Sequence, residues 1–193
     1  MKLERKDLWS LEEYAEERDA FRAEVLAHKK NRRVMLGTHV MLVFEDQLTI
    51  RYQIQEMLRA ERIFEAAGIE EELAAYNPLI PDGDNWKATF LLEYPDVDHR
   101  RKALAGLVGV EFKVWTQVEG CDRIYAVADE DLERSTEEKT SSVHFLRFQL
   151  SPAMVSAAKA GGAISFGVDH PNLSVEIFNL EDPVRSALVA DLD

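Results

Sequence analysis

Two glutamates, Glu61 and Glu65, have the spacing in this sequence that most directly suggests chemistry. They are four residues apart in a segment whose apolar residues recur at helical intervals, so in a helix both carboxylates project from one face. The apolar residues of that face are Ile50, Ile54, Met57, Leu58 and Phe64. A carboxylate on a buried face is costly unless it is compensated. We therefore expect an ion pair, a metal site or a proton-handling site here.

An earlier segment offers a matching partner for an ion pair. Arg18 and Arg22 are also four residues apart, inside the apolar stripe of a first predicted helix. If the two helices pack as an antiparallel pair, the guanidinium groups can face the carboxylates and bind them bidentately. This interpretation predicts a structural network of Arg18, Arg22, Glu61 and Glu65 that fixes helix register.

The alternative is a metal site in which the carboxylate pair is joined by a histidine such as His28. Helix-borne dimetal centres usually add a Glu-x-x-His pair, and the sequence contains none. Glu24 and His28 are one residue too far apart for that motif, although they can share a helix face. A metal is therefore the weaker interpretation of Glu61 and Glu65.

The other histidines and acidic residues give weaker signals. His144 lies in a predicted strand on the same side as Leu146, which is typical of a histidine that bonds a neighbour. The acidic segment from Asp129 to Glu138 does not have the spacing of a calcium-binding EF-hand loop, and we expect it to be solvated.

A candidate small-molecule pocket is predicted beside a rigid loop. The loop, residues 77–83, contains two prolines and an Asp-Gly pair. Asn77, at its start, can line a cleft together with Tyr76 and Trp86, which lie on either side of the loop. Asp169 and His170 follow a predicted strand, where a carboxylate can either stabilise a turn or orient an imidazole for catalysis.

Composition limits the function classes. The 193 residues fit a single domain spanning 1–193, and a net charge of −13 argues against nucleic-acid binding. A single cysteine, Cys121, excludes an intrachain disulfide and a cysteine-based cluster. No stretch approaches a membrane span and the first residues do not resemble a signal peptide, so we expect a cytoplasmic protein.

The pattern along the chain predicts an α+β fold. The expected elements are a largely antiparallel sheet of about five to six strands, with two long N-terminal helices and short helices packed on it. Helices are predicted at about 11–30, 47–67, 70–76, 152–160 and 183–192, and strands at 34–44, 86–94, 110–118, 124–128, 143–150, 163–168 and 175–178.

Four stretches of the sequence resemble a bacterial family of unknown function, whose members have about 190 residues. The stretches are Arg51–Arg59, Ala75–Gly83, Ala126–Leu132 with Lys139–Ser141, and Gly167–Pro171. Members are often encoded beside a rubrerythrin-like protein and an iron–sulfur oxidoreductase. The resemblance therefore implies a role in redox or peroxide defence, but it transfers no catalytic residue.

The leading interpretation is an accessory or interaction protein for a redox partner, with no cofactor of its own. The partner would be the rubrerythrin-like protein or the iron–sulfur oxidoreductase. The alternative is a metal-binding protein or enzyme that uses Glu61 and Glu65 with His28. A third interpretation is a small-molecule binder. Enzymatic activity and a homo-oligomeric state are left open.

Overall fold

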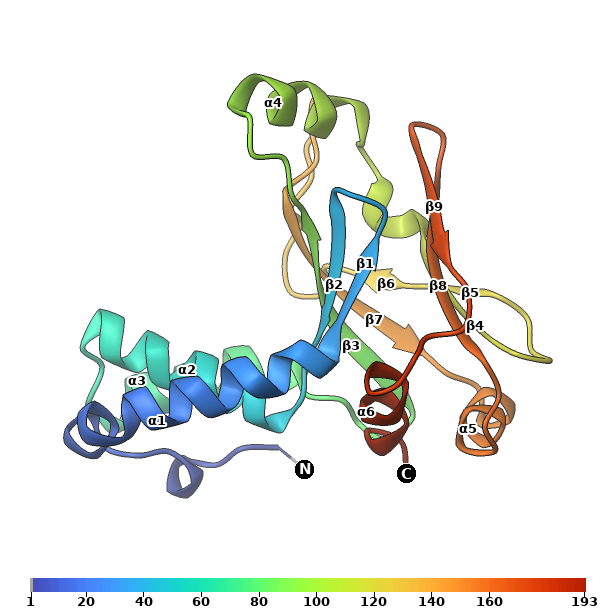
Figure 1. Ribbon diagram of the computed structural model, residues 1–193. Helices are drawn as coiled ribbons and strands as arrows, with labels where there is room; N and C mark the ends of the chain where they lie inside the picture. Colours follow the sequence, from blue (N-terminus) through green and yellow to red (C-terminus); the bar gives the residue numbers. More distant parts are fainter. Residues whose placement is uncertain (1) are drawn as a thin grey trace.

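The computed structural model describes residues 2–193, and its helices lie mainly at the two ends of the chain (Figure 1). The α-helices of the described residues are α1 (Leu11–Lys29), α2 (Gln47–Glu61), α3 (Ala66–Tyr76), α4 (Val97–Gly106), α5 (Pro152–Lys159) and α6 (Val184–Ala190). Short 3-10 turns are η1 (Arg5–Asp7), η2 (Lys30–Arg32), η3 (Asn77–Leu79) and η4 (Val110–Lys113). The predicted α+β class is confirmed.

The strands form two antiparallel sheets. One sheet has the order β1-β2-β3-β7-β6 and the other the order β5-β4-β8-β9. The strands are β1 (Arg33–Leu36), β2 (Val40–Phe44), β3 (Asn85–Leu92), β4 (Val114–Val118), β5 (Ile124–Tyr125), β6 (Val127–Ala128), β7 (Val143–Gln149), β8 (Ile164–His170) and β9 (Leu173–Ile177). The antiparallel pairing matches the prediction, and the structure divides the strands between two sheets.

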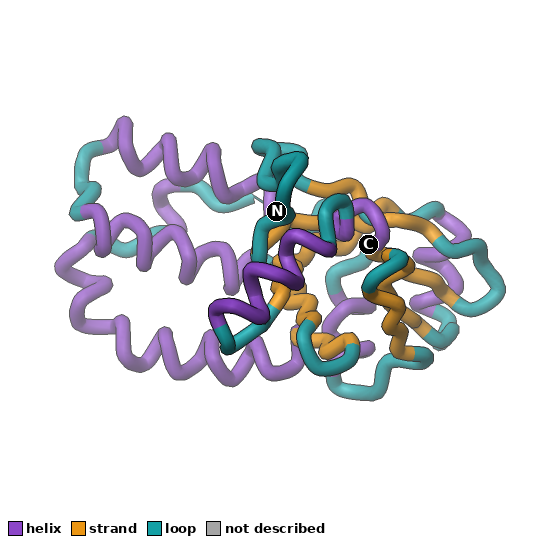
Figure 2. The backbone as a smooth tube through the Cα atoms, turned by 90° about the horizontal axis from the view of Figure 1, so that it is seen from above, coloured by secondary structure: helices purple, strands orange, loops and turns teal. Residues whose placement is uncertain are grey.

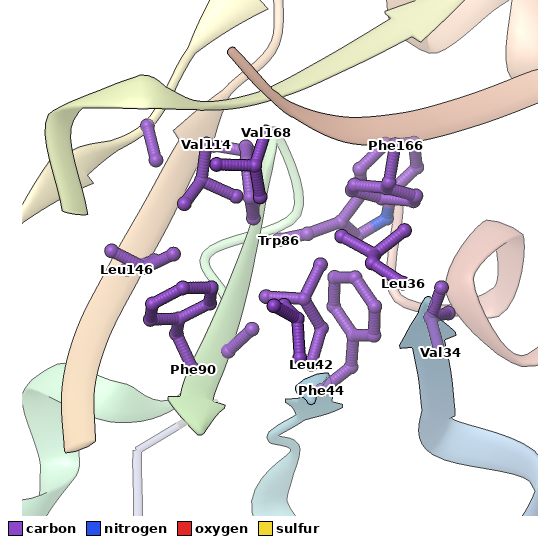
Figure 3. Packing of buried hydrophobic residues seen from close by; sticks show 14 of the residues in the cluster. Val34, Leu36, Leu42, Phe44, Trp86, Phe90, Val114, Leu146, Phe166 and Val168 are labelled. Carbon is purple, nitrogen blue, oxygen red and sulfur yellow. The ribbon is translucent and has the colours of Figure 1, made fainter. Parts of the chain in front are cut away.

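The main hydrophobic core lies between these two sheets. Figure 3 shows Val114, Phe166 and Val168 of one sheet pointing toward Phe44 and Phe90 of the other. Burying such a side chain contributes about 1.5–3 kcal/mol. Since side chains alternate along a strand, the odd-numbered residues of β3 and β7 point to the opposite face of their sheet. That outer face carries Lys87, Phe145 and Arg147.

The N-terminal helices lie to one side of the strands (Figure 2). α1 begins with a capping box, in which Ser10 and Glu13 exchange side chain to backbone hydrogen bonds of 3.2 and 2.9 Å. α2 begins similarly, with Asp46 accepting a 2.9 Å bond from the Thr49 amide. Smaller hydrophobic clusters among these helices are separate from the main core.

Three element boundaries differ from the prediction. The single strand expected at 34–44 is a hairpin of β1 and β2, which turns at Gly37 with φ 66°. α2 ends at Glu61 because Arg62 adopts a left-handed φ of 58° and the Ile63 amide bonds the Leu58 carbonyl. Gly68, the residue after the helix predicted at 47–67, lies inside α3.

Two other segments also depart from the prediction. α4 was not predicted, and the strand expected at 110–118 begins only at Val114, after the turn η4. Within residues 2–193, no helix combines the length and the apolar composition that a membrane crossing requires. The single-domain expectation stays a prediction.

Candidate functional site

The network predicted for Glu61 and Glu65 does not form. Glu61 ends α2, Glu65 precedes α3, and both side chains are exposed because the chain turns at Arg62. Arg18 instead binds Glu56 through two bonds of 2.7 and 2.8 Å. These bonds lower the pKa of Glu56 to about 2. An ion pair therefore joins α1 and α2, but at Glu56, five residues before the predicted Glu61.

The other two members of the predicted cluster also lie elsewhere. Arg22 is exposed on α1. His28 pairs with Asp46, the residue that caps α2, and not with Glu61 or Glu65. The metal site predicted from His28 and the glutamate pair is therefore not assembled in this structure.

Four of the predicted pocket residues have separate structural roles. Trp86 is buried, and its indole N–H donates to the Leu188 carbonyl at 2.8 Å. Asp169 accepts bonds from Arg123 and Tyr125 at 2.7 and 2.9 Å, and buried His170 faces the Val108 carbonyl at 3.2 Å. Asn77 bonds the backbone N–H and carbonyl of Leu3 at 2.8 and 2.9 Å.

A different group of titratable side chains meets near one end of the main core. Potential ligand atoms of Glu111, Asp129 and His144 all lie within 4.8 Å of one another. His144 points into the core side of β7, and its side chain is 0% exposed. The side chains of Glu111 and Asp129 are 2% and 7% exposed. These three residues are called the carboxylate–histidine cluster below.

Local backbone geometry positions the two carboxylates. Gly109, with φ 80°, precedes η4, and this turn directs Glu111 inward while Phe112 remains exposed. Asp129 follows β6 with a left-handed φ of 50°. Asp tolerates that conformation better than most residues, and non-glycine residues held in it are enriched at functional sites.

Asp129 fixes the orientation of the His144 ring. Asp129 Oδ2 lies 2.6 Å from His144 Nδ1, while Oδ1 accepts bonds from the Phe145 amide at 3.0 Å and from Arg134 at 3.2 Å. A carboxylate on Nδ1 favours the tautomer that carries its proton there, in which Nε2 can accept a bond or bind a metal. Nε2 lies 2.8 Å from Thr140 Oγ1 and 3.2 Å from the Ser141 carbonyl oxygen.

Glu111 approaches the same ring from the Nε2 side, at 4.0 Å. It accepts hydrogen bonds from the hydroxyls of Ser135 and Thr140. Within the described part of the chain, no lysine or arginine pairs with it. Glu45 is also buried and bonded to two threonine hydroxyls, but no histidine is among its bonding partners. The cluster thus combines a buried carboxylate with a facing imidazole nitrogen.

The donors of the cluster fit a small divalent cation. A cation bound to both Glu111 and His144 would lie about 2.0–2.2 Å from each ligand atom. Nε2 and the Glu111 oxygen are 4.0 Å apart, so a shift of well under 1 Å brings them to ligand spacing. The hydroxyls of Ser135 and Thr140 add neutral oxygen donors. Asp129 then acts as the outer carboxylate that orients the imidazole.

None of these three residues is among the site residues predicted from the sequence. His144 was interpreted as a histidine that bonds a neighbour, Asp129 as part of a solvated loop, and Glu111 was not selected. The three residues come from η4, the segment after β6, and β7. Only the folding of the two sheets brings these segments together, so no linear spacing marks them.

A cavity of about 720 Å³ lies beside the cluster, on the outer face of β3 and β7. Tyr76 lines it, as do the loop residues Pro78, Leu79 and Asp82. Arg134 joins the two sites, because it lines the cavity and also bonds Asp129 of the cluster at 3.2 Å. Of the predicted pocket residues, Tyr76 alone is among those that line this cavity.

Fold and site together define an α+β protein with two antiparallel sheets and a buried carboxylate–histidine cluster. The chain belongs to the family described as "Protein of unknown function (DUF3501)", whose model matches residues 2–192. It is similar over 100% of both chains to a crystal structure titled as a novel protein of unknown function from Burkholderia pseudomallei, with 51% identity and a TM-score of 0.94. No curated protein matches the chain.

Proposed function

We propose that this protein binds one divalent first-row metal cation at Glu111 and His144, with Asp129 as the supporting carboxylate. The observation that carries the proposal is the position of Asp129, 2.6 Å from Nδ1 of a fully buried imidazole whose Nε2 faces a buried glutamate. In protein metal sites, ligating histidines are typically oriented in this way by a carboxylate on the other ring nitrogen.

Charge compensation supports a cation rather than a purely structural network. Burying an ionised carboxylate is expensive unless a partner neutralises it. Arg134 lies 3.2 Å from Asp129 and also binds Asp131 at 2.6 Å, whereas Glu111 has only hydroxyl donors and the imidazole around it. A divalent cation between Glu111 and His144 supplies the missing positive charge.

The donor types favour some cations over others. One imidazole nitrogen with carboxylate and hydroxyl oxygens suits Mn²⁺, Fe²⁺ or Zn²⁺, whereas a site for soft cations such as Cu(I) would need sulfur ligands. The proposal moves the predicted metal site from Glu61, Glu65 and His28 to a different part of the molecule. The link to a redox partner rests on the family resemblance alone and stays a prediction.

Metal titration of the chelator-stripped protein tests the proposal. Isothermal calorimetry with Zn²⁺ and electron paramagnetic resonance with Mn²⁺ should each show one saturable site per chain. Glu111→Gln and His144→Gln should weaken binding by at least about 100-fold, because each removes a direct ligand. Asp129→Asn should weaken it by about 10–100-fold, the usual effect of losing the supporting carboxylate.

Two exposed residues provide matched controls. His99 on α4 and Glu138 in the acidic segment are both exposed and lie outside the cluster. His99→Gln and Glu138→Gln should bind the metal as the wild type does. The proposal fails if the wild-type protein takes up no metal, or if Glu111→Gln and His144→Gln fold and bind with unchanged affinity.

A further inference from the structure

We propose that the cavity on the outer face of β3 and β7 binds a small organic cation, namely an amine that carries an apolar or aromatic body. This inference is independent of the metal site, since it rests on other side chains. A volume of about 720 Å³ lies within the usual range for small-molecule sites, which is roughly 300–1,000 Å³.

The cavity has two walls of different character. The sheet wall consists of Lys87 from β3, Phe145 and Arg147 from β7, and residues that follow β6. The helix wall consists of Met57 from α2, Glu72 and Tyr76 from α3, and residues of η3. A ligand bound here would therefore contact both the sheet and the N-terminal helices.

Each basic group on the sheet wall already has its own carboxylate. Lys87 pairs with Asp82 at 2.6 Å. Arg134 pairs with Asp131 at 2.6 Å, and Arg147 with Glu130 at 2.7 Å. The arginine bonds lower the pKa of both Asp131 and Glu130, so these carboxylates stay ionised at neutral pH. The sheet wall is thus neutral overall and has no excess positive charge to attract an anion.

Glu72 on the helix wall has no such partner. Its side chain is half-buried and makes no hydrogen bond or ion pair within residues 2–193. Burial raises the pKa of Glu72, and the negative charges of Glu61 and Glu71 raise it further. Lys2, the fourth basic residue at the cavity, is exposed, and its charge acts on Asp82 and not on Glu72. The lining is therefore balanced in total charge, but the negative charge of Glu72 on the helix wall has no partner of its own.

An ammonium group would supply this partner. It can pair with Glu72, and the aromatic ring of Tyr76 lies one helical turn away on the same wall. Apolar side chains between the walls, including Met57, Leu79 and Phe145, can contact the body of the ligand. The face of Phe145 is already covered by the Arg134 guanidinium, 4.5 Å from the ring centre, which leaves Tyr76 for a second cation.

Three matched compounds test the charge of the ligand. Phenethylamine, phenethyl alcohol and hydrocinnamate share a phenyl body and differ in their polar group. Each is titrated into protein labelled with ¹³C at the methionine methyl groups. Met57 lines the cavity, whereas Met154 lies in the main core and serves as an internal reference. The amine should shift the Met57 signal saturably and leave the Met154 signal unchanged.

Glu72→Gln should weaken amine binding at least about tenfold, and Glu70→Gln, an exposed change on the same helix, should not. The amine should bind equally in chelator and to His144→Gln, which separates this site from the metal site. The inference is overturned if no compound shifts Met57, if the carboxylate binds as well as the amine, or if Glu72→Gln binds the amine like the wild type.

Discussion

Two regions of this protein combine one histidine with two carboxylates, and they differ in what lies at their centre. The first, called the Arg32 network, joins His28, Asp46 and Asp191 around the buried guanidinium of Arg32. Arg32 binds both oxygens of Asp191 at 2.7 Å and lies 3.1 Å from Asp46. Its side chain is 2% exposed. This network ties α6 to the helix caps of the N-terminal region.

The carboxylate–histidine cluster has the same residue types without a central cation. Arg134 contacts Asp129 from one side and does not reach Glu111. The comparison indicates that residue types alone do not distinguish a structural network from a binding site. A structural network and a binding site differ in whether the fold itself supplies the positive charge that compensates the carboxylates.

Arg32→Met should have the largest effect, because it leaves the largely buried Asp191 without its partner and leaves Asp46 with His28 alone. Removing one member of a buried ion pair costs about 3–5 kcal/mol. Urea unfolding should show this loss, and added metal should not restore it. Arg33→Met, an exposed change at the next residue, should alter the unfolding free energy by less than about 0.5 kcal/mol. A small loss for Arg32→Met would show that the Arg32 network does not stabilise the fold.

The Arg32 network should also have a characteristic pH dependence. Burial raises the pKa of Asp191 from 3.8 to about 6, despite the attraction of Arg32. Between these values the folded protein binds more protons than the unfolded chain, so the contribution of Asp191 to stability falls as pH rises. The total is at most about 3 kcal/mol between about pH 4 and pH 6.

The measurement compares unfolding free energies of the wild type and Asp191→Asn across that range. The wild type should lose stability relative to the variant as pH rises. Arg32, Asp46 and His28 surround Asp191 and are unchanged in the variant. Parallel curves would show that Asp191 does not titrate in this window.

Glu111→Gln should have a small effect in metal-free protein. The change removes a buried charge that lacks a basic partner, and it preserves the shape of the side chain. We expect stability to stay the same or to rise by up to about 1 kcal/mol in chelator. With excess metal, the wild type should gain about 2.7 kcal/mol at 100 times its dissociation constant, and the variant should gain at most about 0.4 kcal/mol at the same metal concentration. A loss above about 2 kcal/mol in chelator would make the cluster structural, like the Arg32 network.

Substitutions of the glutamates on α2 should have the smallest effects on stability. Glu56→Gln should cost about 1 kcal/mol, because Glu56 accepts two bonds from half-exposed Arg18 and one from Tyr14. Glu61→Gln should cost less than about 0.5 kcal/mol, since Glu61 is exposed. Thermal unfolding of the two variants side by side checks the order. Equal losses of stability would indicate that Glu61 takes part in an ion-pair network, as the sequence predicts.

Sequence patterns predicted the elements well where the signal is local. The helices predicted at 11–30 and 152–160 and the strand predicted at 86–94 correspond to α1, α5 and β3. The patterns gave wrong boundaries where tertiary packing determines the structure. Gly68 follows the helix predicted at 47–67, but a Cβ there would lie 2.7 Å from the Ile63 side chain, so glycine permits close packing inside α3.

The candidate site could not be predicted for the same reason. The apolar stripe continues past Arg62, so the pattern placed Glu61 and Glu65 on one buried helix face. The residues that do converge are Glu111, Asp129 and His144, from three segments that meet only when the sheets pack. Their sequence signals, a polar residue in a turn and a histidine in a strand, are common and do not specify one another.

Anomalous diffraction from crystals soaked in Mn²⁺ tests the central claim most directly. The account predicts an anomalous difference peak between His144 Nε2 and the Glu111 carboxylate, about 2.0–2.3 Å from each, which is absent from Glu111→Gln crystals. The Arg32 network should show no peak, because a guanidinium occupies its centre. A wild-type crystal with no peak at Glu111 and His144, or with the same peak in Glu111→Gln, would contradict the account.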